Sequence, residues 1–158
     1  MPDGVTLPAA AILDGTAGRA EENDTVDLTR ADLGTDVLGP FATTLGMELT
    51  RADGDEVAAH WTARAALHQP YGIVHGGVHC SIVETLASIG ASLWLGDRGK
   101  VVGVSNSTDF FREATQGRLT STATPLHRGR SQQVWVVETR DDDDRLIARG
   151  QVRLQNLG

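Results

Sequence analysis

The stretch that decides the fold is Gly76-Gly77-Val78-His79-Cys80-Ser81-Ile82-Val83-Glu84-Thr85-Leu86-Ala87-Ser88-Ile89-Gly90-Ala91-Ser92-Leu93-Trp94-Leu95. Its large apolar residues recur every three or four positions, at Val78, Ile82, Leu86, Ile89 and Leu93. This is the period of an α-helix, so the stretch predicts one long helix from about Gly76 to Leu95. Strand-like segments lie on both sides of it along the chain. The helix is therefore expected to be buried against a sheet.

Strand patterns precede and follow this helix. Residues Leu45 to Leu67 alternate well enough for two strands, and Asp53-Gly54-Asp55 between them predicts a hairpin turn. Further strands are expected at Val101 to Phe111, Leu119 to Leu126, Gln133 to Thr139 and Leu146 to Leu154. The run Asp141 to Asp144 lacks the ligand spacing and the glycine of a calcium loop, and it predicts a charged hairpin turn. The order of hairpin, helix and a meander of about four antiparallel strands predicts an α+β domain.

One helix cannot cover such a sheet completely. The free edge and the uncovered face of the sheet predict self-association, most simply as a two-fold dimer that extends the sheet.

The domain organisation is simple. Residues 1–27 carry no sustained period and include Glu21-Glu22-Asn23-Asp24, so they are expected to form a flexible N-terminal leader. The folded domain is expected to span residues 28–158. It begins with a short predicted helix from Leu28 to Leu38, which Gly39-Pro40 closes.

The composition excludes several classes of function. The formal net charge is −7 and the arginines are spread along the chain, which argues against a nucleic-acid partner. The single Cys80 cannot form an internal disulfide, and the N-terminus lacks the features of an export signal. The expected compartment is the cytoplasm. No apolar run approaches the roughly 18 to 20 residues that span a bilayer, so no membrane association is expected.

Polar groups concentrate where the long helix begins. Gly76 and Gly77 open it, at a point where backbone N–H groups have no intrahelical acceptor and the helix dipole favours negative charge. Such amides could hold the carbonyl oxygen of an acyl thioester as it becomes an oxyanion. The simpler alternative is that the two glycines only make a tight turn into the helix.

Glu84 lies about two turns into the helix, on a segment whose faces are largely apolar. A helical glutamate is usually a solvated surface residue, but a carboxylate that faces a cleft in apolar surroundings is a candidate general base or nucleophile. Ser88, four residues further on, shares its helix face and could orient an attacking water. Gln69, before the helix, can donate to a carbonyl and accept from a water, or it caps the turn.

His75 and His79 stand four residues apart, which superficially resembles a metal-binding pair. The zinc protease motif has a glutamate directly after its first histidine, and this chain does not, so no metal is expected. His75 is expected to position the thioester carbonyl or the glycine loop, and His79 to be a packing or interface residue. Cys80 is expected to be a small buried side chain and not a nucleophile.

A second polar segment, His127-Arg128-Gly129-Arg130-Ser131-Gln132, joins two of the predicted strands. Two arginines around a glycine, followed by a hydroxyl, suit phosphate oxygens through charge-assisted hydrogen bonds and backbone amides. Solvated arginines are also common in strand turns, so the segment alone is a weak signal.

Together these segments resemble the hotdog-fold acyl-CoA thioesterases of the phenylacetate-type and 4-hydroxybenzoyl-CoA-type branch. The resemblance covers about Leu38 to Leu157. The matching motifs are Gly72-Ile73-Val74-His75-Gly76-Gly77, Glu84 with Thr85-Leu86-Ala87-Ser88, Val102-Gly103, and His127-Arg128-Gly129-Arg130. The resemblance implies a hotdog fold, one long central helix wrapped by an antiparallel β-sheet, in an acyl-CoA thioesterase.

The resemblance also implies roles for individual residues. Gly76 would donate an oxyanion-hole amide, and Glu84 would serve as base or nucleophile, with Gln69, His75 and Ser88 in support. The residues implied to bind substrate or coenzyme A are Gly77, Gly103, Phe110, Phe111, Arg112, His127, Arg128, Gly129, Arg130, Ser131 and Gln132. The segment from Ser105 to Arg112 departs from the pattern of close relatives, which bears on the substrate range.

The expected reaction converts an aromatic or short-to-medium acyl-CoA into a carboxylic acid and coenzyme A. Glu84 would act as general base, or as nucleophile through a mixed anhydride. The resemblance implies a site shared between protomers of a homodimer, which can pair into a homotetramer, and no cofactor besides the coenzyme A thioester substrate. Two alternatives stay open: a hotdog dehydratase of hydroxyacyl thioesters, and a non-catalytic acyl-CoA sensor or scaffold. The set of Gln69, Gly76, Glu84 and Ser88 favours hydrolysis.

Overall fold

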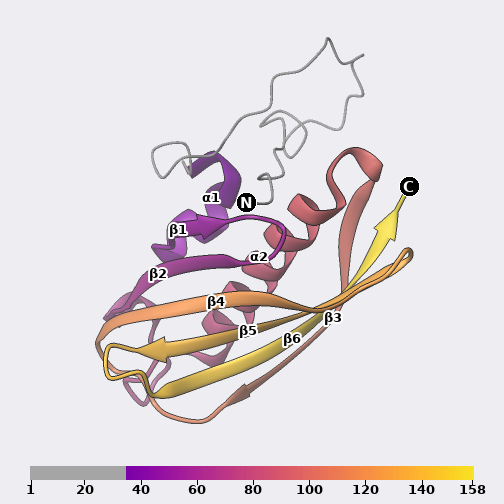
Figure 1. The fold of residues 1–158 in the computed structure, drawn as a ribbon. Helices are drawn as coiled ribbons and strands as arrows, with labels where there is room; N and C mark the ends of the chain where they lie inside the picture. The colour runs from indigo at the N-terminus through magenta and orange to yellow at the C-terminus, as the bar shows by residue number, and fades with distance from the viewer. Residues whose placement is uncertain (1–34) are drawn as a thin grey trace.

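The computed structural model describes residues 35–158; the expected leader at 1–27 and the start of the expected helix at Leu28 lie outside the described residues. The helices are α1 (Thr35–Leu45) and α2 (Gly76–Leu95), with short 3-10 turns η2 (Ala65–Leu67) and η3 (Gly96–Arg98). The strands are β1 (Glu48–Ala52), β2 (Val57–Ala63), β3 (Lys100–Phe110), β4 (Gly117–Arg128), β5 (Gln132–Asp141) and β6 (Leu146–Leu157). The sheet curves around α2, which lies against one of its faces (Figure 1). The predicted α+β class is confirmed, and α2 has the predicted bounds.

The six strands form one antiparallel sheet in the order β1-β2-β4-β5-β6-β3. Strands β4, β5 and β6 follow one another as predicted, and the β1–β2 hairpin joins them through β4. β3 does not lie beside β4; it pairs with β6 along its whole length at the far edge (Figure 1). The prediction of a four-strand meander is therefore wrong. Because α2 carries the chain across the sheet, β3 enters at the edge opposite β1, and the chain must then return to pair with β2.

α2 supplies the centre of the core. Its buried residues are His79, Ile82, Val83, Leu86, Ala87, Gly90, Ala91, Leu93 and Leu95. Trp135 of β5 is fully buried, and a Cβ at Gly90 would come within 2.6 Å of its ring. Glycine at this position therefore lets an indole ring pack directly on the helix backbone.

The segment Gly76–Arg98 is long and apolar enough by composition to cross a membrane, which the interruptions at Glu84 and Gly90 did not lead us to expect. More than half of this segment is buried inside the protein. A helix that packs against a surrounding sheet needs apolar residues on most of its faces. The burial of α2 as a core helix accounts for its composition.

α1 differs from its prediction. Gly39, with φ 69° and ψ 170°, interrupts the helix, and Pro40 then begins a second helical segment that ends at Leu45. The expected stop at Gly39-Pro40 is thus a kink. Proline fits the first turn of the new segment because the N–H that it lacks would have no helical acceptor there.

The turn between β5 and β6 confirms the charged hairpin expected from the four aspartates. Asp141 Oδ1 accepts hydrogen bonds from the N–H groups of Asp143 and Arg145, and Asp141 Oδ2 lies 2.7 Å from the Arg145 guanidinium. Asp144 takes φ 60°. Within residues 35–158, no group of three or more His, Cys, Asp or Glu side chains is arranged to hold a metal ion.

β3 forms an open edge of the sheet and contains a bulge. Its register against β6 shifts between Gly103 and Ser105, so Val104 is an extra residue in the strand. As a result Gly103, Asn106 and Thr108 share the side of β3 that faces α2. The bulge therefore decides which side chains of the edge strand meet the central helix.

Candidate functional site

The N-terminus of α2 is capped by a histidine. His75 is the N-cap residue, and its Nδ1 accepts a hydrogen bond from the Gly77 N–H at 2.8 Å. Within residues 35–158 the Gly76 N–H has no hydrogen-bond acceptor, and no acidic side chain lies in the first turn of α2. Of the two glycine amides, that of Gly76 is the one with a free N–H, at a helix end whose dipole favours negative charge. The His75 side chain thus contacts the glycine loop through the Gly77 N–H.

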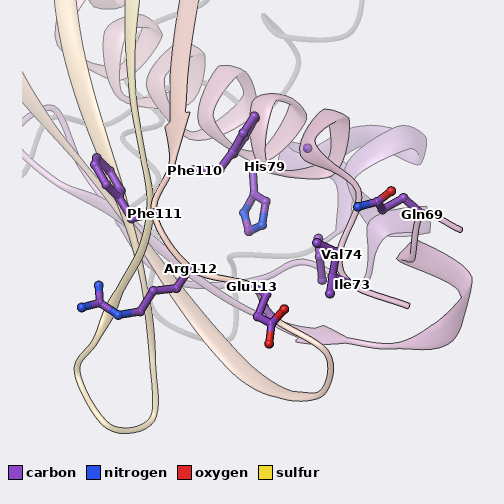
Figure 2. A pocket seen from close by; sticks show the side chains of 10 residues that line it. Gln69, Ile73, Val74, His79, Phe110, Phe111, Arg112 and Glu113 are labelled. Atoms are coloured by element: carbon purple, nitrogen blue, oxygen red, sulfur yellow. The ribbon is translucent and has the colours of Figure 1, made fainter. Parts of the chain in front are cut away.

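A pocket of about 360 Å³ opens beside this amide. Its lining includes five residues expected at the site, Gln69, Gly76, Phe110, Phe111 and Arg112. All of them except Gly76 are labelled in Figure 2. Gln69 lies on the loop before α2, and the aromatic and arginine side chains come from the end of β3 and the residues after it. An apolar wall with a few convergent polar groups is typical of a small-molecule site.

His79 projects from α2 into this pocket (Figure 2). Its ring lies edge-on to Trp61, with the centroids 5.4 Å apart, and 5.8 Å from the ring of Phe110. Burial lowers the pKa of His79 to about 4, so its imidazole is neutral at pH 7. Its buried Nδ1 has no hydrogen-bond partner among the described residues. The prediction of a packing residue is confirmed, and the neutral ring extends the aromatic wall of the pocket.

Glu84 is half-buried and faces the edge strand β3. Its Oε2 accepts a hydrogen bond from Asn106 Nδ2 at 3.0 Å, and its Oε1 lies against Gly103, where a Cβ would overlap it. The Asn106 Nδ2 also donates to the Cys80 carbonyl oxygen at 3.0 Å, and Thr108 Oγ1 donates to Asn106 Oδ1 at 2.8 Å. The carboxylate is therefore held in one orientation by polar neighbours, and Gly103 belongs to its surroundings.

Glu84 and Gly76 do not meet within one chain. Eight residues of helix place them about 12 Å apart along the axis of α2, and Glu84 does not line the pocket beside Gly76. A carbonyl oxygen bound to the Gly76 N–H would lie about 3 Å from that nitrogen, out of reach of the carboxylate of the same chain. Ser88 lies one turn beyond Glu84, and its side chain makes no hydrogen bond within residues 35–158.

His75 and Gly77 line a different cavity. It has a volume of about 500 Å³ and lies between α1 and the first turns of α2, with Phe41, Leu45 and Val78 among its apolar lining. The structure therefore separates two neighbouring glycines that were expected to act together. Gly76 opens toward the pocket of Gln69, whereas Gly77 opens toward α1.

The turn from His127 to Gln132 joins β4 and β5 near the C-terminal end of α2. Arg128 forms an ion pair with Asp55 at 2.8 Å and is thereby engaged within the protein. Arg130 has no ion-pair partner among the described residues, and it borders a cavity of about 310 Å³ together with Arg98. Of the two arginines expected to meet phosphate, Arg130 is thus the one without an ion pair within residues 35–158.

Asn106 and Thr108 were not among the residues expected at the site. Strict alternation along β3 would place Asn106 and Gly103 on opposite faces, and only the bulge at Val104 brings them together. The available signal was the uninterrupted polar run from Ser105 to Asp109, which is unusual in a strand that packs one face on a core.

Comparisons with known proteins agree with this geometry. A family model described as the thioesterase superfamily matches residues 71–148. The proofreading thioesterase EntH of Cronobacter turicensis is 33% identical over 121 residues, which cover 77% of this chain and 88% of EntH. In the crystal structure of S. sahachiroi AziG, 98% of that chain matches 76% of this one, with 63% identity and a TM-score of 0.75. The thioesterase HI1161 from Haemophilus influenzae matches 82% of this chain and 91% of its own, with 28% identity and a TM-score of 0.76.

A single long helix wrapped by an antiparallel sheet is the hotdog fold, which this chain shares with solved thioesterases such as HI1161. This chain belongs to the thioesterase superfamily, and it is a thioester hydrolase.

Proposed function

We propose that this hydrolase acts on acyl-CoA esters with an aromatic or short-to-medium acyl group. The observation that supports this most is the Gly76 N–H, which has no acceptor within residues 35–158 and opens onto a pocket that Gln69 also lines. The carbonyl oxygen of a thioester would accept a hydrogen bond from this N–H, and the Gln69 amide can donate to the same oxygen. The aromatic wall formed by His79 and Phe110 suits an apolar acyl group.

Glu84 supplies the reactive group in this proposal. As general base it takes a proton from a water whose oxygen bonds to the carbonyl carbon; as nucleophile its own oxygen attacks and forms an anhydride, which water then opens. In both routes the carbonyl oxygen becomes an oxyanion beside the Gly76 N–H. The C–S bond then breaks, the sulfur leaves as the thiol of coenzyme A after gaining a proton, and a carboxylic acid is formed.

A second copy of the chain completes the site. Because Glu84 lies about 12 Å from Gly76 along α2, the carboxylate must come from the antiparallel helix of a partner. β3 is the natural contact, since it is a sheet edge on which Val102 and Val104 are exposed. Antiparallel pairing of β3 with its copy would extend the sheet across a two-fold axis, and such dimers can pair further into tetramers.

The charged end of coenzyme A needs cations. Arg130, which has no ion-pair partner among the described residues, is the proposed contact of the turn from His127 to Gln132. Arg98 borders the same cavity. Its guanidinium donates to the carbonyl oxygens of Trp94 and Leu95, and its remaining N–H groups can donate to phosphate oxygens.

Thiol release from a panel of acyl-CoA esters tests the function. The wild-type protein is expected to hydrolyse at least one of benzoyl-, hydroxybenzoyl-, phenylacetyl- and short aliphatic acyl-CoA with saturation kinetics, and the rank order would define the acyl group. Binding of acyl-CoA measured by calorimetry serves as the companion assay. Tight binding to several esters with no thiol release from any of them would refute the enzyme proposal and support a sensor.

Complementation between two inactive variants tests the shared site. Glu84→Gln and Gly76→Pro homodimers are each expected to be nearly inactive, since each lacks one half of both sites. A heterodimer purified through two different tags contains one intact site, because Glu84 comes from one chain and Gly76 from the other. It is expected to regain about half of the wild-type kcat per dimer. A heterodimer as inactive as its parents would show that both groups act within one chain.

A further inference from the structure

The surroundings of Glu84 contain a chain of hydrogen bonds that begins on the edge strand. Thr108 Oγ1 donates to Asn106 Oδ1 at 2.8 Å, which requires the amide of Asn106 to present its NH₂ group toward α2. That NH₂ group then donates to the Cys80 carbonyl oxygen and to Glu84 Oε2, both at 3.0 Å. Both donors of the amide and its acceptor are therefore used, and the orientation of Asn106 is defined.

The position of the other oxygen, Glu84 Oε1, depends on the missing side chain of Gly103. Oε1 lies against the backbone of Gly103 at a point where any Cβ would overlap it. Gly103 and Asn106 share this face only because of the bulge at Val104. The bulge at Val104 therefore accounts both for the hydrogen bond to Oε2 and for the space that Oε1 occupies beside Gly103.

We infer that Asn106 and Thr108 are positioning residues for the Glu84 carboxylate. Gly103, which has no side chain, leaves the room that the carboxylate occupies. The inference rests on the proposed function, in which Glu84 is the reactive carboxylate. Asn106 holds Oε2, so Oε1 is the oxygen left to take the proton of a water or to bond to the acyl carbon. A carboxylate free to rotate would reach this geometry only part of the time, and kcat would fall in proportion.

Substitution at Asn106 gives the main test. Asn106→Ala is expected to lower kcat by about 10- to 100-fold, the effect of losing one hydrogen bond to a charged group, while KM stays near the wild-type value. Thr108→Val removes only the donor that orients Asn106, so a smaller loss of kcat is expected, and Thr108→Ser restores the hydroxyl and the rate. Gly103→Ala is expected to displace Oε1 and to lower kcat as well.

The matched control is Gln151→Ala. Gln151 is an exposed residue of β6 that pairs with Ser107 of β3, so the substitution removes a side-chain amide that does not contact Glu84. It is expected to behave as wild type. Asn106→Ala with an unchanged kcat, or with an effect on KM alone, would overturn the positioning role. So would a failure of Thr108→Ser to do better than Thr108→Val.

A crystal structure of Asn106→Ala keeps the inference separate from the proposed function. The Glu84 side chain is expected to occupy a different rotamer or several, whereas a carboxylate in its wild-type place would refute the positioning role even if no acyl-CoA is hydrolysed. If the wild-type protein hydrolyses no ester but Glu84 moves in the variant, the proposed function fails and the positioning contact stands.

Discussion

Glu84→Gln is expected to lower kcat for acyl-CoA hydrolysis by about 10²- to 10⁴-fold, the usual contribution of a positioned proton-transfer group. Glutamine keeps the length of the side chain and an oxygen that can accept the hydrogen bond from Asn106. It cannot take the proton of an attacking water, and it is a poor nucleophile. The loss is therefore expected in kcat with little change in KM, measured by steady-state thiol release with the best ester of the panel.

Glu48→Gln is the matched control for this experiment. It makes the same chemical change at an exposed position of β1, a strand that does not line the pocket. It is expected to keep wild-type kinetics, and equal unfolding temperatures of the three proteins would show that the fold is intact. A Glu84→Gln protein that turns over as fast as wild type would exclude the carboxylate as base or nucleophile.

Gly76→Pro is expected to lower kcat by about 10²- to 10³-fold, which corresponds to the 2.7 to 4 kcal/mol typically lost with one oxyanion-hole donor. Proline deletes the N–H from the first residue of α2, a position where helices tolerate it. The residue before it, His75, already has φ −63° and ψ 134°, the extended conformation that a following proline favours. The substitution therefore removes the proposed oxyanion donor and leaves the helix start in place.

Gly76→Ala separates the missing N–H from simple crowding. An alanine Cβ would come within 2.9 Å of the Phe110 ring, as proline would, but alanine keeps the amide hydrogen. The Phe110 side chain is 54% exposed and can move aside. Gly76→Ala is therefore expected to retain most of the activity. Equal losses in the two variants would assign the effect to Phe110 and would exclude the Gly76 amide as the oxyanion donor.

Local sequence was sufficient for α2 and for the first hairpin. The recurrence of apolar residues every three or four positions requires no partner to be recognised, and the helix has the predicted bounds. The turn at Asp53-Gly54-Asp55 was equally readable, since its residues tolerate the backbone angles of a tight turn. The thioesterase class came from a resemblance to a known family, carried by the Gly72 to Gly77 lead-in, the Glu84 segment and two further motifs. The cytoplasmic compartment, the leader at 1–27 and the oligomeric state stay predictions.

The strand that pairs with β3 could not be predicted from the sequence. A strand pattern shows that a segment is extended, but pairing depends on where α2 returns the chain to the sheet, which is a property of the whole domain. Similarly, the ion pair of Arg128 with Asp55 joins two hairpins that are far apart in sequence, so it could not be predicted from local patterns.

The residues proposed to react and the residues proposed to position them were therefore recognised in different ways. Gly76 and Glu84 are visible in the sequence because a helix start and a carboxylate in an apolar helix are local features. Asn106 and Gly103 come to Glu84 only through the edge position and the bulge of β3, which reverse the faces that alternation predicts. The separation of Gly76 from Glu84 by two helical turns also follows from the folded geometry. For this reason the sequence was sufficient to nominate Gly76 and Glu84, whereas only the three-dimensional packing shows how the Glu84 carboxylate is held and how far it lies from Gly76.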